Sequence, residues 1–131
     1  MLNELRNLCL IDGISGDEGK VREYIISRIK DKCEYSVDPM GNLLVFKKGK
    51  NKPKNKVMLS AHMDEVGFIC TYICDNGFIK FTNVGGVDPK VAVGRAVKIG
   101  ENKISGVIGN KAVHLCSDDE DKTAPKLDKL Y

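Results

Sequence analysis

The spacing of apolar residues changes near residue 65, and few folds accommodate both halves of the pattern. Before that point, apolar residues recur at the three-to-four-residue spacing of helices and then alternate as in strands. Beyond it, only short apolar runs occur, separated by glycines. Such glycine-punctuated runs indicate bent strands in a small barrel-like sheet. We therefore expect a mixed helix-and-strand region over 1–65 and a separate small all-β domain over 66–131.

Two helices are expected at the start of the chain. Leucines and a cysteine at helical spacing predict an amphipathic helix over residues 1–10, which Gly13 and Gly16 end. Ser15, followed three residues later by Glu18, matches a capping box that opens a second helix. The apolar stripe of that helix consists of Val21, Tyr24, Ile25 and Ile29.

Three strands should follow in the first region, at 35–37, 43–46 and 57–61. The last run is apolar on both faces, which is typical of a strand buried inside a sheet. His62, Asp64 and Glu65 come directly after it. In open α/β sheets, ligands and catalytic groups collect at the carboxyl ends of strands.

The second region begins with a hairpin signal, in which 66–73 and 78–82 flank Asp75-Asn76-Gly77. Further short strands are predicted at 91–93, 96–99, 104–108 and 112–115. The last of these would contain His114, which we interpret as a structural strand residue. After a polar stretch, Leu127, Leu130 and Tyr131 begin another apolar pattern.

Composition narrows the class of protein. The net charge is only +3, and the lysines between Lys47 and Lys56 have no interleaved aromatic residue or arginine. A solvated strand connection is therefore favoured over a nucleic-acid surface. The N-terminus lacks the pattern of a secretory signal, and no apolar run could span a bilayer. With five cysteines and no disulfide-like spacing, we expect reduced thiols in a cytoplasmic protein without membrane contact.

Several possible binding features have simpler explanations. Cys70 and Cys74 lie roughly 13 Å apart on a straight strand, too far for one zinc ion, so half-buried core thiols are the better interpretation. No helix follows Gly85-Gly86, which favours a tight turn over a phosphate loop. The acidic run 118–121 lacks the spacing of a calcium loop and is interpreted as solvated.

His62-Met63-Asp64 is the sharpest candidate for chemistry. In an extended segment, residues two apart point the same way, so Asp64 could accept the N–H of the His62 ring. A metal-binding histidine usually donates its second ring N–H to such a carboxylate. Taken alone, the triplet favours a structural or surface histidine over a metal ligand, because such triplets often arise by chance.

The surroundings of the triplet resemble a known family. The segment 60–68, Ser-Ala-His-Met-Asp-Glu-Val-Gly-Phe, is similar to the strand-end motif of the glutamyl, or tetrahedral, aminopeptidases. Other segments are similar to successive landmarks of that family, in the same order, so that the resemblance covers essentially the whole chain. They are 13–18, 38–43, 83–89, 106–115 and 122–131.

This resemblance implies an α/β metallopeptidase core interrupted by a small β-rich insertion. In the family, two metal ions, usually zinc or cobalt, activate water against the N-terminal peptide bond of a peptide substrate. His62 matches a metal ligand and Asp64 its orienting catalytic carboxylate, while Glu65 matches the motif without an assigned role. The insertion mediates dimerisation and, in many members, larger hollow assemblies, so a homo-oligomer is expected through 66–131.

The resemblance also implies an incomplete site. Residues 1–65 match the N-terminal part of the catalytic domain and 66–131 the insertion, whereas the other ligands and the general base follow the insertion in the family. We therefore expect a truncated aminopeptidase chain that is inactive alone. The alternatives are a non-catalytic oligomerisation module derived from that family and, more distantly, a nucleic-acid-binding protein.

Overall fold

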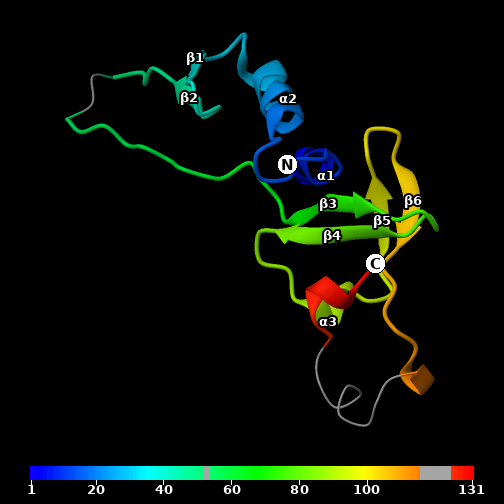
Figure 1. Cartoon of the computed structure of the whole chain (residues 1–131). Helices are drawn as coiled ribbons and strands as arrows, with labels where there is room; N and C mark the ends of the chain where they lie inside the picture. The colour runs from blue at the N-terminus through cyan, green and yellow to red at the C-terminus, as the bar shows by residue number, and fades with distance from the viewer. Residues whose placement is uncertain (52–53, 116–124) are drawn as a thin grey trace. The chain divides into compact units, whose positions relative to one another are not determined.

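The computed structural model describes residues 1–51, 54–115 and 125–131. The chain divides into two compact units, Met1–Glu65 and Val66–Tyr131. Figure 1 shows helices α1 and α2 in the first unit, and the hairpins β3–β4 and β5–β6 in the second. Each unit is described by itself below.

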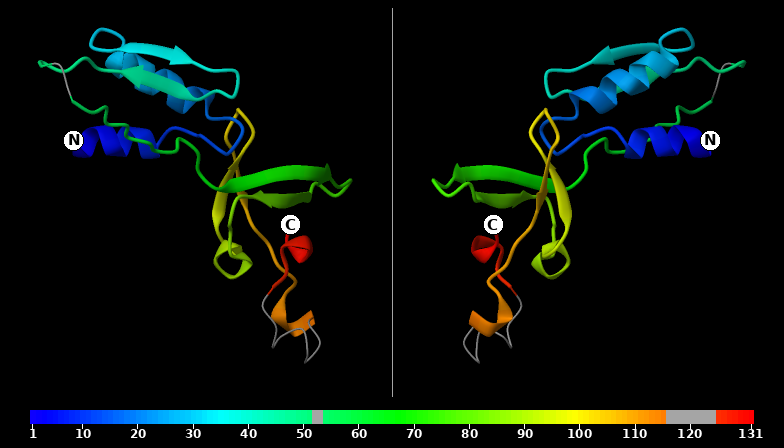
Figure 2. Two further views of the ribbon diagram at one scale, coloured as in Figure 1. Left: turned by 90° about the vertical axis from the view of Figure 1, so that its left-hand side faces the viewer. Right: turned by 90° about the vertical axis from the view of Figure 1, so that its right-hand side faces the viewer.

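The first unit contains α1 (Leu2–Cys9), α2 (Gly19–Ile29) and an antiparallel hairpin of β1 (Glu34–Val37) and β2 (Leu43–Phe46). The turn of this hairpin is closed by Asp38, whose Oδ1 accepts from the backbone N–H groups of Met40 and Asn42 at 3.0 and 2.8 Å. The hydrogen bond from Nδ2 of Asn42 to Oδ2 of Asp38 at 2.8 Å, followed by that from the Asn42 backbone, holds the pKa of Asp38 below its usual value. Helix α2 lies alongside the hairpin (Figure 2).

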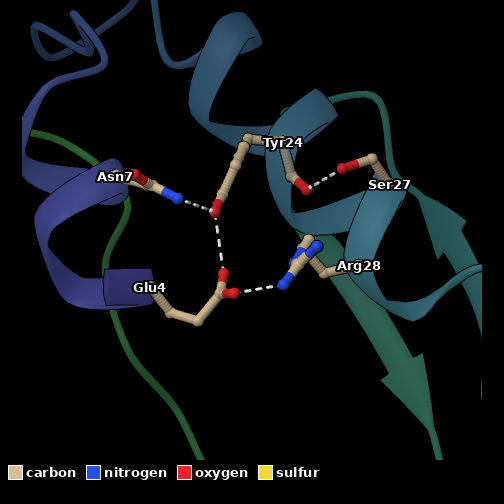
Figure 3. A network of polar contacts seen from close by, with 5 residues as sticks. All are labelled: Glu4, Asn7, Tyr24, Ser27 and Arg28. Atoms are coloured by element: carbon tan, nitrogen blue, oxygen red, sulfur yellow. Dashed lines mark hydrogen bonds and ion pairs between the residues drawn. The ribbon is translucent and has the colours of Figure 1, made fainter. Parts of the chain in front are cut away.

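Polar side chains link α1 to α2 (Figure 3). The Tyr24 hydroxyl donates to Oε2 of Glu4 at 2.7 Å and accepts from Nδ2 of Asn7 at 3.0 Å. Arg28 forms an ion pair with the same Glu4 carboxylate. The hydrogen bond from Tyr24, followed by that from Arg28, lowers the pKa of Glu4. This network holds two helices together at a surface where few apolar side chains are covered.

Residues 57–61 do not form the buried strand that their apolar pattern predicts. The described residues 54–64 run as an extended trace without regular pairing (Figure 1). Val57, Met58 and Leu59 are 87%, 88% and 93% exposed. A strand apolar on both faces is stable only between neighbouring strands and under covering layers, and within the described part of this unit β2 pairs with β1 alone. The prediction is wrong for this structure because those neighbours are missing from it.

The second unit contains two antiparallel hairpins. β3 (Gly67–Ile73) pairs with β4 (Ile79–Val84), and β5 (Ala96–Ile99) pairs with β6 (Ile104–Val107). The predicted Asn-Gly turn joins the first pair, and Gly77 adopts a φ of +83°, which glycine reaches at little cost. The remaining elements are single turns: α3 (Pro89–Ala92), η1 (Val113–Leu115) and η2 (Leu127–Lys129).

Two predicted strands of this unit are wrong. The expected strand 91–93 overlaps α3, because Pro89 occupies the start of a helical turn and the Asp88 carboxylate accepts from the Lys90 N–H at 3.0 Å. The expected strand 112–115 overlaps the 3-10 turn η1. His114 is therefore an exposed residue of a turn and not a structural strand residue.

Ala92, Ile108 and Leu130 form the buried core of the second unit, each 3% exposed. Phe68 and Phe81 pack against this core with their rings edge to face, 4.9 Å apart. The last residues close it, since Gly109 and Tyr131 exchange two backbone hydrogen bonds of 2.6 and 3.2 Å. The apolar pattern at 127–131 thus completes the second unit.

The remaining expectations concern the cysteines, the acidic run and membrane-spanning helices. Cys74 is half-buried as expected, but Cys70 is exposed on β3 and is not a core thiol. Cys116 and the acidic run 118–121 lie outside the described residues. Over the parts of the chain that the structure describes, no helix is both long and apolar enough to cross a membrane.

Candidate functional site

The motif at 62–65 is attached to the loop before α2. The Glu65 N–H donates to the carbonyl of Gly13 at 2.7 Å, and the Ser15 N–H donates to the carbonyl of Glu65 at 3.3 Å. Ile14 and Glu65 form an isolated parallel bridge, and Oε1 of Glu65 also accepts from the Gly13 N–H at 3.3 Å. Glu65, which has no role in the sequence analysis, therefore fastens the motif to a segment about fifty residues earlier in the chain.

Gly13 allows this loop to lie close against helix α2. A Cβ atom there would lie 3.4 Å from the Met63 carbonyl oxygen and 2.6 Å from Cγ2 of Val21, the one buried apolar residue described in this unit. The second distance is shorter than atoms tolerate. A larger residue at position 13 would clash with Val21 of α2, so the valine side chain or the loop would have to shift.

His62 and Asp64 lie side by side, as their spacing predicts. Nδ1 of His62 is 3.0 Å from Oδ1 of Asp64 and 2.9 Å from the Asp64 backbone carbonyl oxygen. Both partners are acceptors when the carboxyl is ionised, so Nδ1 of the neutral ring carries the hydrogen and Nε2 keeps its lone pair. The imidazole is 85% exposed. Its free nitrogen is therefore available to an external group.

The second oxygen of Asp64 has its own partner. Ser15 donates its hydroxyl to Oδ2 of Asp64 at 2.5 Å. This hydrogen bond, and then that from His62, lowers the pKa of Asp64 against the opposing effect of partial burial. The carboxyl group is consequently an anion at neutral pH, with both oxygens engaged inside the unit.

Ser15 was missed as a site residue by the sequence reasoning, which assigned it to a helix cap. Helix α2 begins only at Gly19 and has no side-chain cap hydrogen bond. Glu18 accepts instead from the Gly16 N–H at 2.7 Å. Spacing within the chain gives no signal for a hydrogen bond that joins residues 49 positions apart.

An open groove lies beside the motif. It runs between β2 and the extended segment, and its lining includes Leu44, Phe46, Leu59 and His62. The side chains of Leu44 and Phe46 are exposed there. His62 thus stands at the edge of an apolar groove within the first unit.

The residues near the motif can be compared with the requirements of a metal site. Catalytic zinc sites use three protein ligands and one open position. His62 suits one of those positions, because its Nε2 is exposed and its Nδ1–H is held by a carboxylate. No group of three histidine, cysteine or acidic residues in the described ranges is placed to hold one ion. Within those ranges, the fit is therefore to one ligand position and not to a whole site.

Comparisons with known proteins identify relatives of this chain. A protein of Acetivibrio thermocellus is 43% identical over 133 residues, covering 100% of this chain and 37% of its own length. The glutamyl aminopeptidase of Lactococcus lactis is 31% identical over 88% of this chain and 34% of its own length. The chain thus spans about a third of the curated relatives it matches.

A solved structure matches the fold as well. It is that of the Pyrococcus horikoshii TET1 peptidase, which can assemble into a tetrahedron or a large octahedral shell. The TM-score is 0.80 at 39% identity, over 98% of this chain and 38% of that one. The two units therefore have the fold of part of such a peptidase.

A family model also matches most of this chain. The model of the M42 glutamyl aminopeptidase family matches residues 41–131, which include the His62–Asp64 motif and the whole second unit. This chain belongs to the M42 glutamyl aminopeptidase family, which is a family of peptide hydrolases.

Proposed function

We propose that this chain supplies one metal ligand, His62, and its orienting carboxylate, Asp64, to a two-metal aminopeptidase that removes N-terminal residues from peptides. The observation that supports the proposal best is the contact of 3.0 Å between Nδ1 of His62 and Oδ1 of Asp64, which leaves Nε2 exposed. The family is one of metallopeptidases and implies divalent metal ions. Zinc or cobalt is the choice that we propose.

Each residue has a separate task in this proposal. His62 offers its Nε2 lone pair, and Asp64 fixes the ring and its tautomer from the opposite side. When bound, two divalent ions would supply Lewis-acid activation of water and of the scissile carbonyl group. Glu65 holds the motif against residues 13–15 through its backbone and its carboxylate.

The proposal includes inactivity of this chain by itself. One imidazole binds a metal ion weakly, and a positioned general base is also needed. We therefore propose that further ligands come from chain beyond these residues or from a second polypeptide. The groove beside β2 is where such added chain would cover the exposed Leu44, Phe46 and Leu59.

Complementation tests this function. The chain is assayed on amino-acid anilides with zinc or cobalt, alone and after mixing with the remaining part of the Acetivibrio thermocellus relative. We expect no turnover alone and metal-dependent turnover in the mixture. His62→Ala should abolish that turnover, and His114→Ala, which removes the other histidine, should preserve it. Robust cleavage by the chain alone that is lost in His62→Ala would show that the site is already complete.

The alternative is a non-catalytic oligomerisation module. The second unit supports it with a buried core of its own. Ile73, Ile104 and Val107 are exposed on its strands and would be covered in a homo-oligomer formed through residues 66–131. A homo-oligomer of this kind is compatible both with the aminopeptidase and with the non-catalytic module. We propose a cytoplasmic location in either case.

Sedimentation at high micromolar concentration tests the assembly. We expect the mass of a dimer or a larger species, and a strictly monomeric mass would contradict it. Failure of complementation together with robust self-association would favour the non-catalytic module.

A further inference from the structure

The Ser15 hydroxyl is committed to Asp64 and to no local helix cap. It donates to Oδ2 at 2.5 Å, while Oδ1 of the same carboxylate meets the His62 ring at 3.0 Å. The three side chains thus form one line, in which a hydroxyl, a carboxylate and an imidazole are joined by two hydrogen bonds. Because the two carboxylate oxygens have different partners, the orientation of the carboxylate is defined from both ends.

The position of the hydroxyl is set by backbone. The Ser15 N–H donates to the carbonyl of Glu65, and the N–H of Glu65 donates to the carbonyl of Gly13. Ser15 therefore belongs to the bridge that holds the motif, and its side chain enters the site from a fixed point. A serine on a free loop would lose more entropy in making the same contact.

The His62 ring has little else to hold it. The side chain is 85% exposed, and the carboxyl group of Asp64 is 39% exposed. If Oδ2 loses its donor, the carboxylate can turn toward water, and the Nδ1–H of His62 then loses one of its two acceptors. The ring becomes free to exchange to the form with hydrogen on Nε2, which has no lone pair at that nitrogen for a metal ion.

We propose that Ser15 is a positioning residue, whose hydroxyl holds the Asp64 carboxylate so that His62 keeps its hydrogen on Nδ1 and presents the Nε2 lone pair. The use of that lone pair rests on the proposed function. The hydrogen-bonded line itself stands on the geometry of this unit. The two can therefore fail separately.

The tautomer of His62 is the direct readout. The whole chain is labelled with ¹⁵N at histidine and studied without metal at about pH 8, well above the usual histidine pKa of about 6.5. Long-range ¹H–¹⁵N correlation then shows which ring nitrogen carries the hydrogen. The chain has two histidines, so His114 serves as an internal reference.

We expect His62 to be chiefly the Nδ1–H form in the unmodified chain. Ser15→Ala should move it toward the Nε2–H form, and Ser15→Thr should restore the original spectrum because it keeps a hydroxyl. Ser27→Ala is the matched control, since Ser27 donates only locally, to the Tyr24 carbonyl at 2.6 Å. His114 should not change in any variant. An unchanged His62 spectrum in a folded Ser15→Ala variant would overturn the proposal.

A second variant covers the case in which Ser15→Ala does not fold. Ser15→Cys keeps the shape of the side chain, with a larger terminal atom, and has only a weak S–H donor. It should carry more of the Nε2–H form of His62 than the unmodified chain. If the cysteine chain matches the unmodified one, the proposal is wrong.

Zinc titration of the same samples separates this inference from the function. We expect zinc to shift the His62 resonances, with an affinity about tenfold weaker in Ser15→Ala, in the range known for groups that orient a ligand. A tautomer change, with no zinc-induced shift of His62 even after mixing with the complementing part of the relative, would refute the ligand role of His62 and keep the role of Ser15. Zinc binding by His62 without a tautomer change in Ser15→Ala would keep the ligand role of His62 and refute the role of Ser15.

Discussion

The two units of this chain are stabilised in different ways. The second unit buries Ala92, Ile108 and Leu130 in one cluster with aromatic rings packed against it. Among the described residues of the first unit, Val21 alone is a buried apolar side chain. The first unit is joined mainly by polar contacts, such as the Glu4–Tyr24 hydrogen bond and the bridge between 13–15 and Glu65.

This difference shows that the motif at 62–65, which is typical of the family, does not lie in the unit with the larger buried core. The candidate site belongs to the unit with the smaller core, and its exposed apolar residues are those that a larger sheet would cover. The second unit needs no such cover for its own core. We therefore expect mutations to affect the two units unequally.

The largest expected effect is on the core of the second unit. Ile108→Ala removes three carbons from a site that is 3% exposed, which should lower the free energy of unfolding of this unit by about 2–4 kcal/mol. Ile104→Ala, on β6 and 63% exposed, is the control and should cost much less. Amide hydrogen exchange, read separately in β5–β6 and in α2, provides the measurement.

The two units would not differ in stability as we expect if Ile108→Ala raised amide hydrogen exchange in both of them to the same extent. That result would mean that they unfold as one cooperative body. Faster exchange confined to residues 66–131 would show that the second unit has its own stability.

The second effect concerns the attachment of the site within the first unit. Gly13→Ala places a Cβ 2.6 Å from Cγ2 of Val21 and should destabilise this unit by about 1–3 kcal/mol. If the clash is relieved by a shift of the loop, the backbone hydrogen bonds of residues 13–15 to Glu65 should weaken and the His62 tautomer should change with them. Gly49→Ala is the control in the same unit, because its Cβ would make only an ordinary contact of 3.5 Å.

Chemical shifts of His62 and thermal unfolding measure the two consequences together. A Gly13→Ala chain with the His62 spectrum and the melting temperature of the Gly49→Ala chain would contradict the close approach. It would also remove the reason for a glycine at the entry to the site.

Local patterns in the sequence were enough to predict some of this structure. Helical spacing predicts α1 and α2, and the Asn-Gly turn predicts the β3–β4 hairpin, because the interactions that form these elements lie within a few residues. The proximity of His62 and Asp64 has the same origin, since alternation along an extended chain places them together.

The errors arise where structure depends on distant residues or on competing local signals. The apolar pattern of 57–61 is that of a buried strand, which requires neighbouring strands. The pattern does not show whether those strands are present. Ser15 satisfies a capping pattern, yet its hydroxyl bonds to Asp64, which lies far along the chain. At 91–93, the helix-starting Pro89 and its Asp88 cap outweigh the preference of the valines for a strand.

The smallest expected effect is on the polar link between α1 and α2. Tyr24→Phe removes the strongest cause of the lowered pKa of Glu4, so this pKa should rise toward its usual value, with Arg28 still holding part of the shift. Tyr35→Phe, on β1, is the control and should leave Glu4 unchanged. Titration of the carboxyl groups by NMR measures both.

The sign of the pH dependence follows from the direction of the shift. The pKa of Glu4 is lower in the folded state than in the unfolded state, so the folded state binds fewer protons at this group. Its contribution to stability is complete above the unfolded pKa and is lost as the pH falls through the folded pKa. In Tyr24→Phe the folded pKa should lie closer to the unfolded pKa, so that loss should be smaller and should be complete at a higher pH. Because the carboxylate is exposed and screened by water, the effect should appear in the exchange of α1 and α2 and leave β5–β6 unaffected. An unchanged Glu4 titration in Tyr24→Phe would mean that the ion pair with Arg28, and not the tyrosine hydroxyl, controls this carboxylate.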